Sequence, residues 1–157
     1  MNLILWRHAE AEDIAASDLA RQLTARGRKQ AQTVGKWLRA RIDADALILV
    51  SPAVRTVQTA ESLSDQYRVV REIAPDASAD AVLADAVLAA AGWPNGIAQT
   101  VVIVGHQPTL GHVAARLLAH SGASWPVKKA GVWWFESRER AGDEQAVLRA
   151  AISPELI

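Results

Sequence analysis

The sequence predicts one three-layer α/β domain, residues 1–157, with a mostly parallel central sheet and a strand pair at one side. Short, wholly apolar runs occupy residues 3–6, 47–50 and 101–104, and longer helical patterns lie between them. Two further strand-like segments close the chain. Continuous apolar runs are typical of strands covered on both faces. The alternation of such strands with helices favours an α/β fold.

The composition fits a globular protein and excludes several function classes. Half of the 157 residues are apolar and 22% are charged, which is the balance of one ordinary folded domain. The 17 basic and 17 acidic side chains give zero net charge, which argues against a broad nucleic-acid or membrane-surface binder. The absence of cysteine excludes disulfides, thiolate nucleophiles and cysteine-based zinc sites. Without a membrane-length apolar stretch or a leader-like start, we expect a soluble, cytoplasmic monomer.

Four helical patterns accompany the apolar runs. Thr24 is a suitable N-cap for a helix that continues to about Ile42, with apolar residues at helical spacing. Pro52 and Pro108 each follow an apolar run closely, and each is predicted to open a helix because proline is favoured at the first helical position. An alanine-rich segment, residues 78–91, predicts one more helix, which ends before a Gly-Trp-Pro sequence.

The last part of the chain differs from the rest. Residues 132–135 and 146–152 are strand-like and flank a polar turn that contains Gly142 and Asp143. This pattern predicts a hairpin at one side of the sheet. The adjacent Lys128 and Lys129 indicate a solvated turn before the hairpin, with docking of a partner as the alternative.

Polar residues follow each of the three apolar runs, where each predicted strand ends. These clusters are Arg7 with His8, Ser51 with Arg55, and Gly105 with His106. In an open α/β sheet, ligands bind at the carboxyl ends of the strands, and helix N-termini there offer unpaired N–H groups. A cation such as Arg55 in the first turn of a helix opposes the helix dipole unless an anion lies beside it. The sequence therefore predicts an oxyanion pocket, with phosphate as the natural ligand.

Four segments, in a fixed order, carry a resemblance to a known family. They are Arg-His-Ala at 7–9, the stretch 21–27 that contains Leu-Thr and ends in Gly, Ser-Pro-Ala-Val-Arg-Thr-Val-Gln-Thr-Ala at 51–60, and Gly-His-Gln-Pro at 105–108. Together they resemble the R-H-G, R-x-L-T-x-x-G, S-P-x-x-R-x-x-Q-T-A and G-H-x-P motifs of the histidine phosphatase superfamily. Any one motif is weakly specific, but four in order are a strong indication. The resemblance implies a phosphoglycerate mutase-like fold and is greatest to the SixA-type phosphohistidine phosphatases.

The chemistry of phosphoryl transfer gives four of these residues a role. His8 is the candidate nucleophile, because an imidazole can attack phosphorus and divide one displacement into two. Arg7 and Arg55 are expected to clamp the non-bridging oxygens and stabilise their charge. His106 is expected to donate to the same oxygens as an imidazolium.

Two further residues receive roles from the resemblance. It implies that Arg21 is an outer phosphate or partner contact, and Gly105 is expected to take part in substrate binding. No metal and no cofactor are expected, because the positive side chains supply the charge that Mg²⁺ supplies in other phosphoryl-transfer sites.

The sequence departs from the family pattern at the proton donor and beside the nucleophile. Ala9 stands where the motif has glycine. Glu72, Asp76 and Asp80 lie in the region of the expected general acid, but none falls in a recognisable motif, and Asp76 and Asp80 are the candidates. A phosphohistidine needs an acid least, because an imidazole leaves easily. The weak acid pattern and the absence of cap insertions therefore favour phosphohistidine as the substrate.

The leading hypothesis is a phosphohistidine phosphatase that acts on a histidine-phosphorylated signalling or phosphotransfer protein. The first alternative is a small-molecule phosphomonoesterase that uses the same His8 chemistry, and a mutase is disfavoured because substrate-handling insertions are lacking. The second alternative is a catalytically silent module that binds phosphate or a phosphoprotein. The full set of arginines and histidines disfavours this module, because a binder needs no nucleophile.

Overall fold

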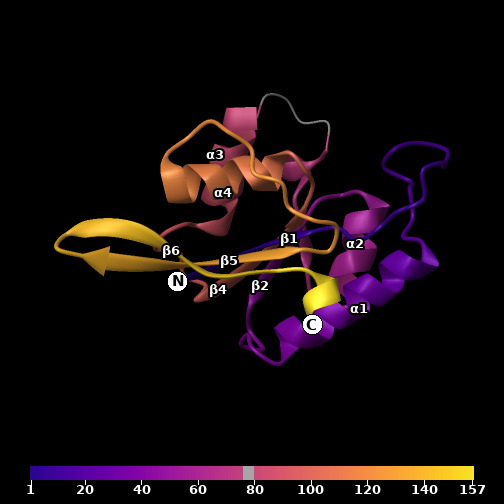
Figure 1. Cartoon of the computed structure of the whole chain (residues 1–157), viewed down its shortest axis with the longest axis horizontal. Helices are drawn as coiled ribbons and strands as arrows, with labels where there is room; N and C mark the ends of the chain where they lie inside the picture. The colour runs from indigo at the N-terminus through magenta and orange to yellow at the C-terminus, as the bar shows by residue number, and fades with distance from the viewer. Residues whose placement is uncertain (76–79) are drawn as a thin grey trace.

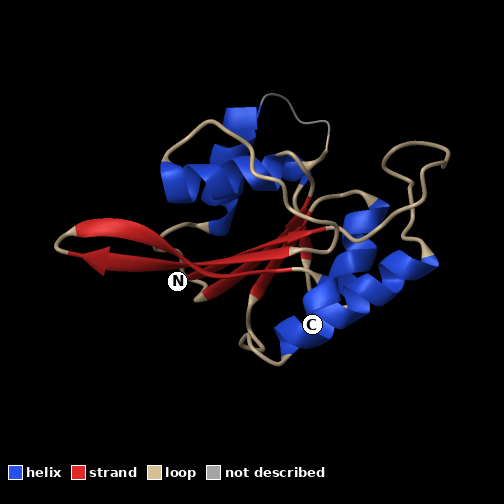
Figure 2. Ribbon diagram, in the orientation of Figure 1, coloured by secondary structure: helices blue, strands red, loops and turns tan. Residues whose placement is uncertain are grey.

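The computed structural model describes residues 1–75 and 80–157, and within them a six-stranded sheet carries helices on both faces (Figure 2). The strands are β1 (Asn2–Arg7), β2 (Leu47–Val50), β3 (Arg68–Val69), β4 (Thr100–Gly105), β5 (Val132–Arg140) and β6 (Asp143–Ile152). The helices are α1 (Ala25–Arg39), α2 (Val54–Glu61), α3 (Asp80–Ala91) and α4 (Thr109–Ala119), with short 3-10 turns η1 (Arg71–Ile73) and η2 (Pro154–Leu156).

The sheet confirms the predicted α/β architecture. Its strand order is β3-β2-β4-β1-β5-β6. The first four strands in this order are parallel, and β5 and β6 continue the sheet as an antiparallel hairpin. All six residues of β4 are buried, as a continuous apolar run predicts for a strand covered on both faces.

Two apolar layers hold the helices against the sheet. Alternate residues of each strand face opposite sides, so Ile4 and Trp6 pack with α1 and α2, while Leu3 and Leu5 pack with α3 and α4. Figure 1 shows this division, with α3 and α4 above the sheet and α1 and α2 below it. Within the described residues, no helix is both long enough and apolar enough to cross a membrane.

Helix boundaries differ from the prediction at two places. Helix α1 begins after the predicted N-cap Thr24, whose hydroxyl accepts from the Gly27 N–H, but it ends at Arg39 and not near Ile42. Helix α2 begins at Val54, two residues after Pro52. The Val54 N–H donates to the carbonyl of Leu19 at 2.9 Å, so the loop before α1 provides the acceptor for the first N–H of this helix.

The strands also differ from the prediction in detail. Strand β5 extends to Arg140 and strand β6 begins at Asp143, so the loop between them is shorter than the predicted polar turn. The strand β3 escaped prediction because its two residues are exposed and form no apolar pattern. Helix α3 begins at Asp80, and the predicted start of that helix at residue 78 lies outside the described residues.

Candidate active site

Strand register brings the three polar clusters to one edge of the sheet. Arg7 at the end of β1 is level with Gly105 at the end of β4, and Val50 at the end of β2 is level with Val104. The backbone N–H of His8 donates to the Gly105 carbonyl at 3.0 Å. The N–H of Ser51 donates to the Val104 carbonyl at 3.1 Å. The hydrogen bonds of the sheet therefore continue into the residues that carry the chemistry.

The imidazole of His8 is buried, and one hydrogen bond decides which nitrogen holds its proton. Its Nδ1 lies 2.7 Å from the carbonyl oxygen of Ala9. A carbonyl only accepts, so Nδ1 carries the proton and Nε2 keeps its lone pair. Burial, together with the charges of Arg55, Arg7 and Arg21, lowers the pKa of His8 to about 4, although the bond to Ala9 acts in the opposite direction. The ring is therefore neutral near pH 7, as a nucleophile must be.

Hydrogen bonds fix the backbone of Ala9, and the backbone conformation there accommodates an alanine side chain. Its N–H donates to the Thr59 hydroxyl on α2 at 3.1 Å, and the Thr59 hydroxyl donates to the Arg55 carbonyl at 2.7 Å. Ala9 is not among the residues with positive φ. An alanine is therefore unstrained where the family motif has glycine, and its carbonyl still fixes the His8 tautomer.

Arg55 comes from the first turn of α2 and is only 4% exposed. Its NH1 donates to the Asp18 backbone carbonyl at 2.7 Å, and its NH2 lies 3.1 Å from the Asp18 carboxylate. Arg21 binds the other carboxylate oxygen of Asp18 at 3.1 Å and also donates to the Glu12 carbonyl. The partial burial of Asp18 tends to raise its pKa, but the hydrogen bonds from Arg55 and Arg21 outweigh this and lower the pKa. Asp18 therefore joins two of the predicted site arginines.

Arg7 is fixed by a contact with the backbone before β5. Its NH1 donates to the Val127 carbonyl at 2.7 Å. Burial lowers the pKa of Arg7, although the group stays charged near neutral pH. The Nε atoms of Arg7 and Arg55 are buried and have no hydrogen-bond partner within the described residues. A phosphoryl group, with several acceptor oxygens, is a suitable partner for a site so rich in donors.

His106 faces His8 across the site, with ring centroids 5.3 Å apart. Its Nδ1 lies 3.4 Å from NH2 of Arg55, which can only donate, so the proton resides on Nε2 and is donated to the Ser51 hydroxyl at 2.7 Å. Burial and the neighbouring His8 and Arg55 lower the pKa of His106 to about 3. The ring is therefore neutral near pH 7, mainly because it is buried. The imidazolium expected beside a bound phosphoryl group stays a prediction.

The remaining predicted residues are less directly placed. Gly105 accepts the backbone N–H of His8 with its carbonyl, and its part in substrate binding stays a prediction. Asp76 lies outside the described residues. Asp80 is the first residue of α3. Within residues 1–75 and 80–157, no group of three histidine, cysteine or acidic residues is arranged to hold a metal ion.

Sequence reasoning missed the two residues that orient the site from outside it. Asp18 stands three residues before Arg21, a spacing that offers an ion pair but does not reveal the contact with Arg55. Thr59 lies four residues after Arg55 on α2, and its bond to Ala9 depends on how α2 packs against the end of β1. Both contacts join segments that are far apart in the chain, so neither follows from local pattern.

Known proteins share both the sequence and the fold. The family model for the histidine phosphatase superfamily (branch 1) matches residues 3–78. The chain is 31% identical to a phosphohistidine phosphatase SixA homolog of Haemophilus influenzae, with 98% of this chain and 97% of the relative covered. It is 32% identical to phosphohistidine phosphatase SixA of Escherichia coli, over 74% of each chain.

The solved structures agree at the level of the fold. The structure of the protein histidine phosphatase SixA complexed with tungstate has a TM-score of 0.79 to this chain, with 22% identity and 99% of both chains covered. The phosphoglycerate mutase-like fold that the resemblance implied is therefore confirmed. Since a relative more than 30% identical spans nearly the whole chain, the protein belongs to the histidine phosphatase superfamily.

Proposed function

We propose that the chain is a phosphohistidine phosphatase that removes phosphate from a histidine-phosphorylated protein through a covalent intermediate on His8. The observation that carries this proposal is the hydrogen bond from His8 Nδ1 to the Ala9 carbonyl, which leaves a neutral ring with Nε2 available for attack. A module that only binds phosphate gains nothing from this tautomer. The names of the relatives from Haemophilus influenzae and Escherichia coli support phosphohistidine as the substrate class.

The first step transfers the phosphoryl group to His8. Nε2 attacks phosphorus, a new P–N bond forms, and the P–N bond of the substrate breaks. When the other ring nitrogen of the substrate carries a proton, its histidine leaves as a neutral imidazole and needs no general acid. Arg7 and Arg55, whose charges both act on the His8 ring, stabilise the charge on the non-bridging oxygens. This route requires neither Asp76 nor Asp80 as a proton donor.

The second step returns the enzyme to its starting state. Water attacks phosphorus of the phosphorylated His8, the P–N bond to Nε2 breaks, and inorganic phosphate leaves. The net reaction is hydrolysis of phosphohistidine to histidine and phosphate. Arg55 NH2 lies 3.4 Å from His106 Nδ1, and the His106 ring lies 5.3 Å from the His8 ring. This proximity supports contacts of both residues with a phosphoryl group on His8. An anionic phosphoryl group there also supplies the negative charge that permits His106 to take up a proton.

We further propose that the reaction needs no metal, because the guanidinium groups of the buried Arg55 and the half-buried Arg7 supply the positive charge. One sheet spans Asn2 to Ile152, which supports one domain over residues 1–157. A monomeric state stays a prediction from the sequence. Action in the cytoplasm stays a prediction from the sequence.

One experiment separates the candidate functions. The purified protein is offered, in EDTA, a phosphohistidine-bearing protein and an alkyl phosphate, and released phosphate is measured. Turnover of the first substrate alone supports the proposal. Comparable turnover of both favours a general phosphomonoesterase, and binding of phosphate without turnover of either favours a silent module. A requirement for added divalent metal would contradict the metal-independent route.

A further inference from the structure

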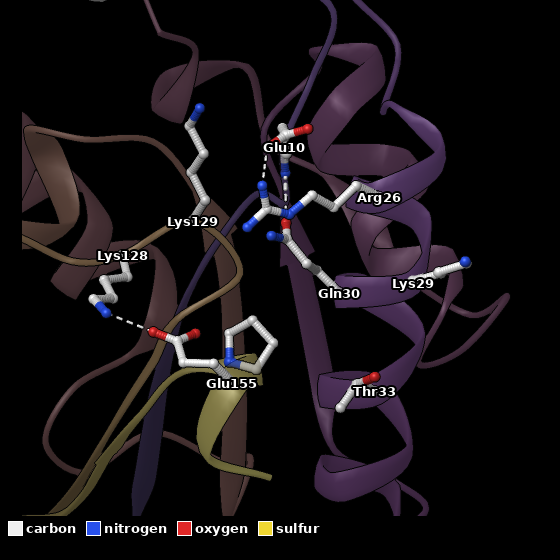
Figure 3. Close-up of a pocket in the computed structure, with 9 residues that line it drawn as sticks. Glu10, Arg26, Lys29, Gln30, Thr33, Lys128, Lys129 and Glu155 are labelled. Atoms are coloured by element: carbon white, nitrogen blue, oxygen red, sulfur yellow. Dashed lines mark hydrogen bonds and ion pairs between the residues drawn. The ribbon is translucent and has the colours of Figure 1, made fainter.

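A pocket of about 630 Å³ lies beside the candidate active site, between α1 and the turn before β5 (Figure 3). Arg26, Lys29 and Gln30 on α1 form one wall, and Lys128 and Lys129 form the other. The Lys29 ammonium group points away from the opposite wall, toward the rim (Figure 3). The C-terminal turn η2 closes one end with Pro154 and Glu155. This volume is large enough for several side chains of a peptide ligand and is larger than the volume of a single phosphate ion.

The pocket concentrates positive charge in a chain whose net charge is zero. Three of the four lysines in the sequence line it, together with Arg26. Both lining carboxylates are already paired, Glu10 with Arg26 at 3.8 Å and Glu155 with Lys128 at 2.5 Å. Within the described part of the chain, Lys29 and Lys129 make no ion pair. The first turn of α1 holds no acidic residue, but the Glu10 carboxylate accepts from the hydroxyl of the N-cap Thr24 at 2.9 Å, so the positive potential comes from the side chains and not from the helix dipole.

The backbone ties this pocket to the nucleophile. Glu10, on the pocket floor, comes two residues after His8 and is fixed by a bond from its N–H to Gln30 on α1 at 3.1 Å. On the opposite wall, the N–H of Ala130, next to Lys129, donates to the His8 carbonyl at 3.0 Å. Both walls of the pocket are therefore hydrogen-bonded to the segment that carries His8, so residues flanking a phosphohistidine at His8 would lie within reach of the pocket.

We propose that this pocket binds an acidic segment of the partner protein, one whose aspartate or glutamate side chains flank the phosphohistidine. The inference rests on the proposed function and names the chemistry of its substrate. Cations spread over two walls suit several carboxylates along a polypeptide, because each lysine can meet a different side chain. The charges are exposed, so they act by steering and by weak pairs that salt screens.

Two double variants with equal charge changes test the pocket. The test variant is Arg26→Glu/Lys129→Glu, with one change on each wall. The control variant is Arg138→Glu/Lys36→Glu, which replaces an exposed arginine on the hairpin and an exposed lysine on α1, neither of which lines the pocket. Substrates are two peptides that carry one phosphohistidine, flanked by glutamates in one and by glutamines in the other. Phosphoramidate, which has no peptide, reports on the chemical site alone.

We expect the unaltered protein to turn over the glutamate peptide at least five-fold more efficiently than the glutamine peptide at low salt, with the advantage in KM. The test variant should lose or invert this preference while it keeps phosphoramidate turnover within about two-fold. The control variant should keep the preference. Equal rates on the two peptides, or a control variant that loses the preference equally, would overturn the pocket assignment.

Failure of the pocket and failure of the proposed function give different results. Turnover of both peptides without preference retains the function and rejects the pocket. If neither peptide releases phosphate, the function is wrong, and the pocket is then judged by fluorescence anisotropy with the unphosphorylated peptides. Tighter binding of the glutamate peptide, lost in the test variant only, would support the pocket by itself. If the test variant impairs turnover of an alkyl phosphate as strongly as turnover of the glutamate peptide, the pocket serves a small substrate. That result would reject the pocket as a docking site.

Discussion

The carboxylate of Asp18 lies 3.1 Å from the guanidinium of Arg55, so an exposed loop residue partners one of the most buried charges in the site. The same carboxylate binds Arg21, and the Asp18 backbone carbonyl receives a second bond from Arg55. Asp18 therefore orients two cations and also reduces the net positive charge that a phosphoryl group meets. These two effects act in opposite directions, which allows them to be separated by experiment.

Asp18→Asn should expose both effects. The amide retains the size of the side chain but removes its charge, so Arg55 loses its charged partner and its fixed direction. We expect kcat to fall by about ten-fold, while inorganic phosphate inhibits more strongly because the site gains one net positive charge. Steady-state kinetics with phosphate as inhibitor measures both. A variant with weaker phosphate inhibition and reduced stability would show that Asp18 serves the fold only.

His8→Ala should remove turnover while it preserves the fold. Without the nucleophilic nitrogen, no phosphoenzyme can form, and we expect at least a 10³-fold loss of kcat/KM. Phosphorus NMR of the acid-labile phosphoenzyme, together with circular dichroism, checks the result. His120→Asn, at an exposed position with positive φ that asparagine accepts, is the matched control and should be fully active. Retained activity in His8→Ala would refute the nucleophile assignment.

The lowered histidine pKa values predict how acid affects rate and stability. Burial, the largest cause for both rings, lowers the pKa of His8 to about 4 and of His106 to about 3. Phosphoenzyme formation should therefore persist as pH falls from 7 to 5 and decline only near pH 4, where His8 becomes protonated. Rapid-quench measurement of phosphoenzyme against pH tests this. A decline centred near pH 6.5 would show that His8 titrates as an ordinary histidine.

The same shifts affect the free energy of unfolding. Between pH 6.5 and about 4, the unfolded chain takes up protons on these histidines that the folded chain does not, so folding is favoured above this window and weakened as pH falls through it. Urea midpoints should fall from pH 7 to pH 4.5. His8→Asn and His106→Asn should each show a smaller fall than the unaltered protein, and an unchanged fall in both would contradict the predicted cause.

Gly27→Ala should destabilise the protein because α1 meets the segment after the nucleophile at this glycine. A methyl group at Gly27 would lie 1.9 Å from the backbone oxygen of Glu10, so the helix or the segment must move. We expect a loss of about 3 kcal/mol in the free energy of unfolding. Gly122→Ala, where nothing lies within 4 Å of the added methyl, is the control and should be neutral or slightly stabilising. Chemical denaturation measures both variants.

The apolar runs predicted the central strands because a strand that is buried on both faces consists almost entirely of apolar residues. The polar residues after them predicted His8, Arg55 and His106 at one edge, because parallel strands all end at the same side. What escaped prediction depends on contacts between distant segments. The neutral state of His106 follows from its burial beside Arg55, and the role of Asp18 follows from how its loop folds over α2.

Strand β3 and the start of α2 escaped for a related reason. Two exposed residues make no periodic pattern, so Arg68 and Val69 became a strand only through pairing with β2. Helix α2 begins at Val54 because the Leu19 carbonyl, thirty-five residues earlier, accepts its first N–H. Local propensity, including that of Pro52, does not contain this information.

The bond from the His8 N–H to the Gly105 carbonyl continues the ladder between β1 and β4, the two innermost strands. The nucleophile and the histidine that faces it are therefore anchored in the part of the protein that opens last during unfolding. Catalytic activity and global folding should therefore be regained at the same rate during refolding, without an inactive intermediate that has a folded sheet. The Asp18 loop and the turn that carries Lys128 and Lys129 lie outside this hydrogen-bonded ladder. Substitutions there could therefore change the proposed partner recognition without changing the residues at the centre of the sheet.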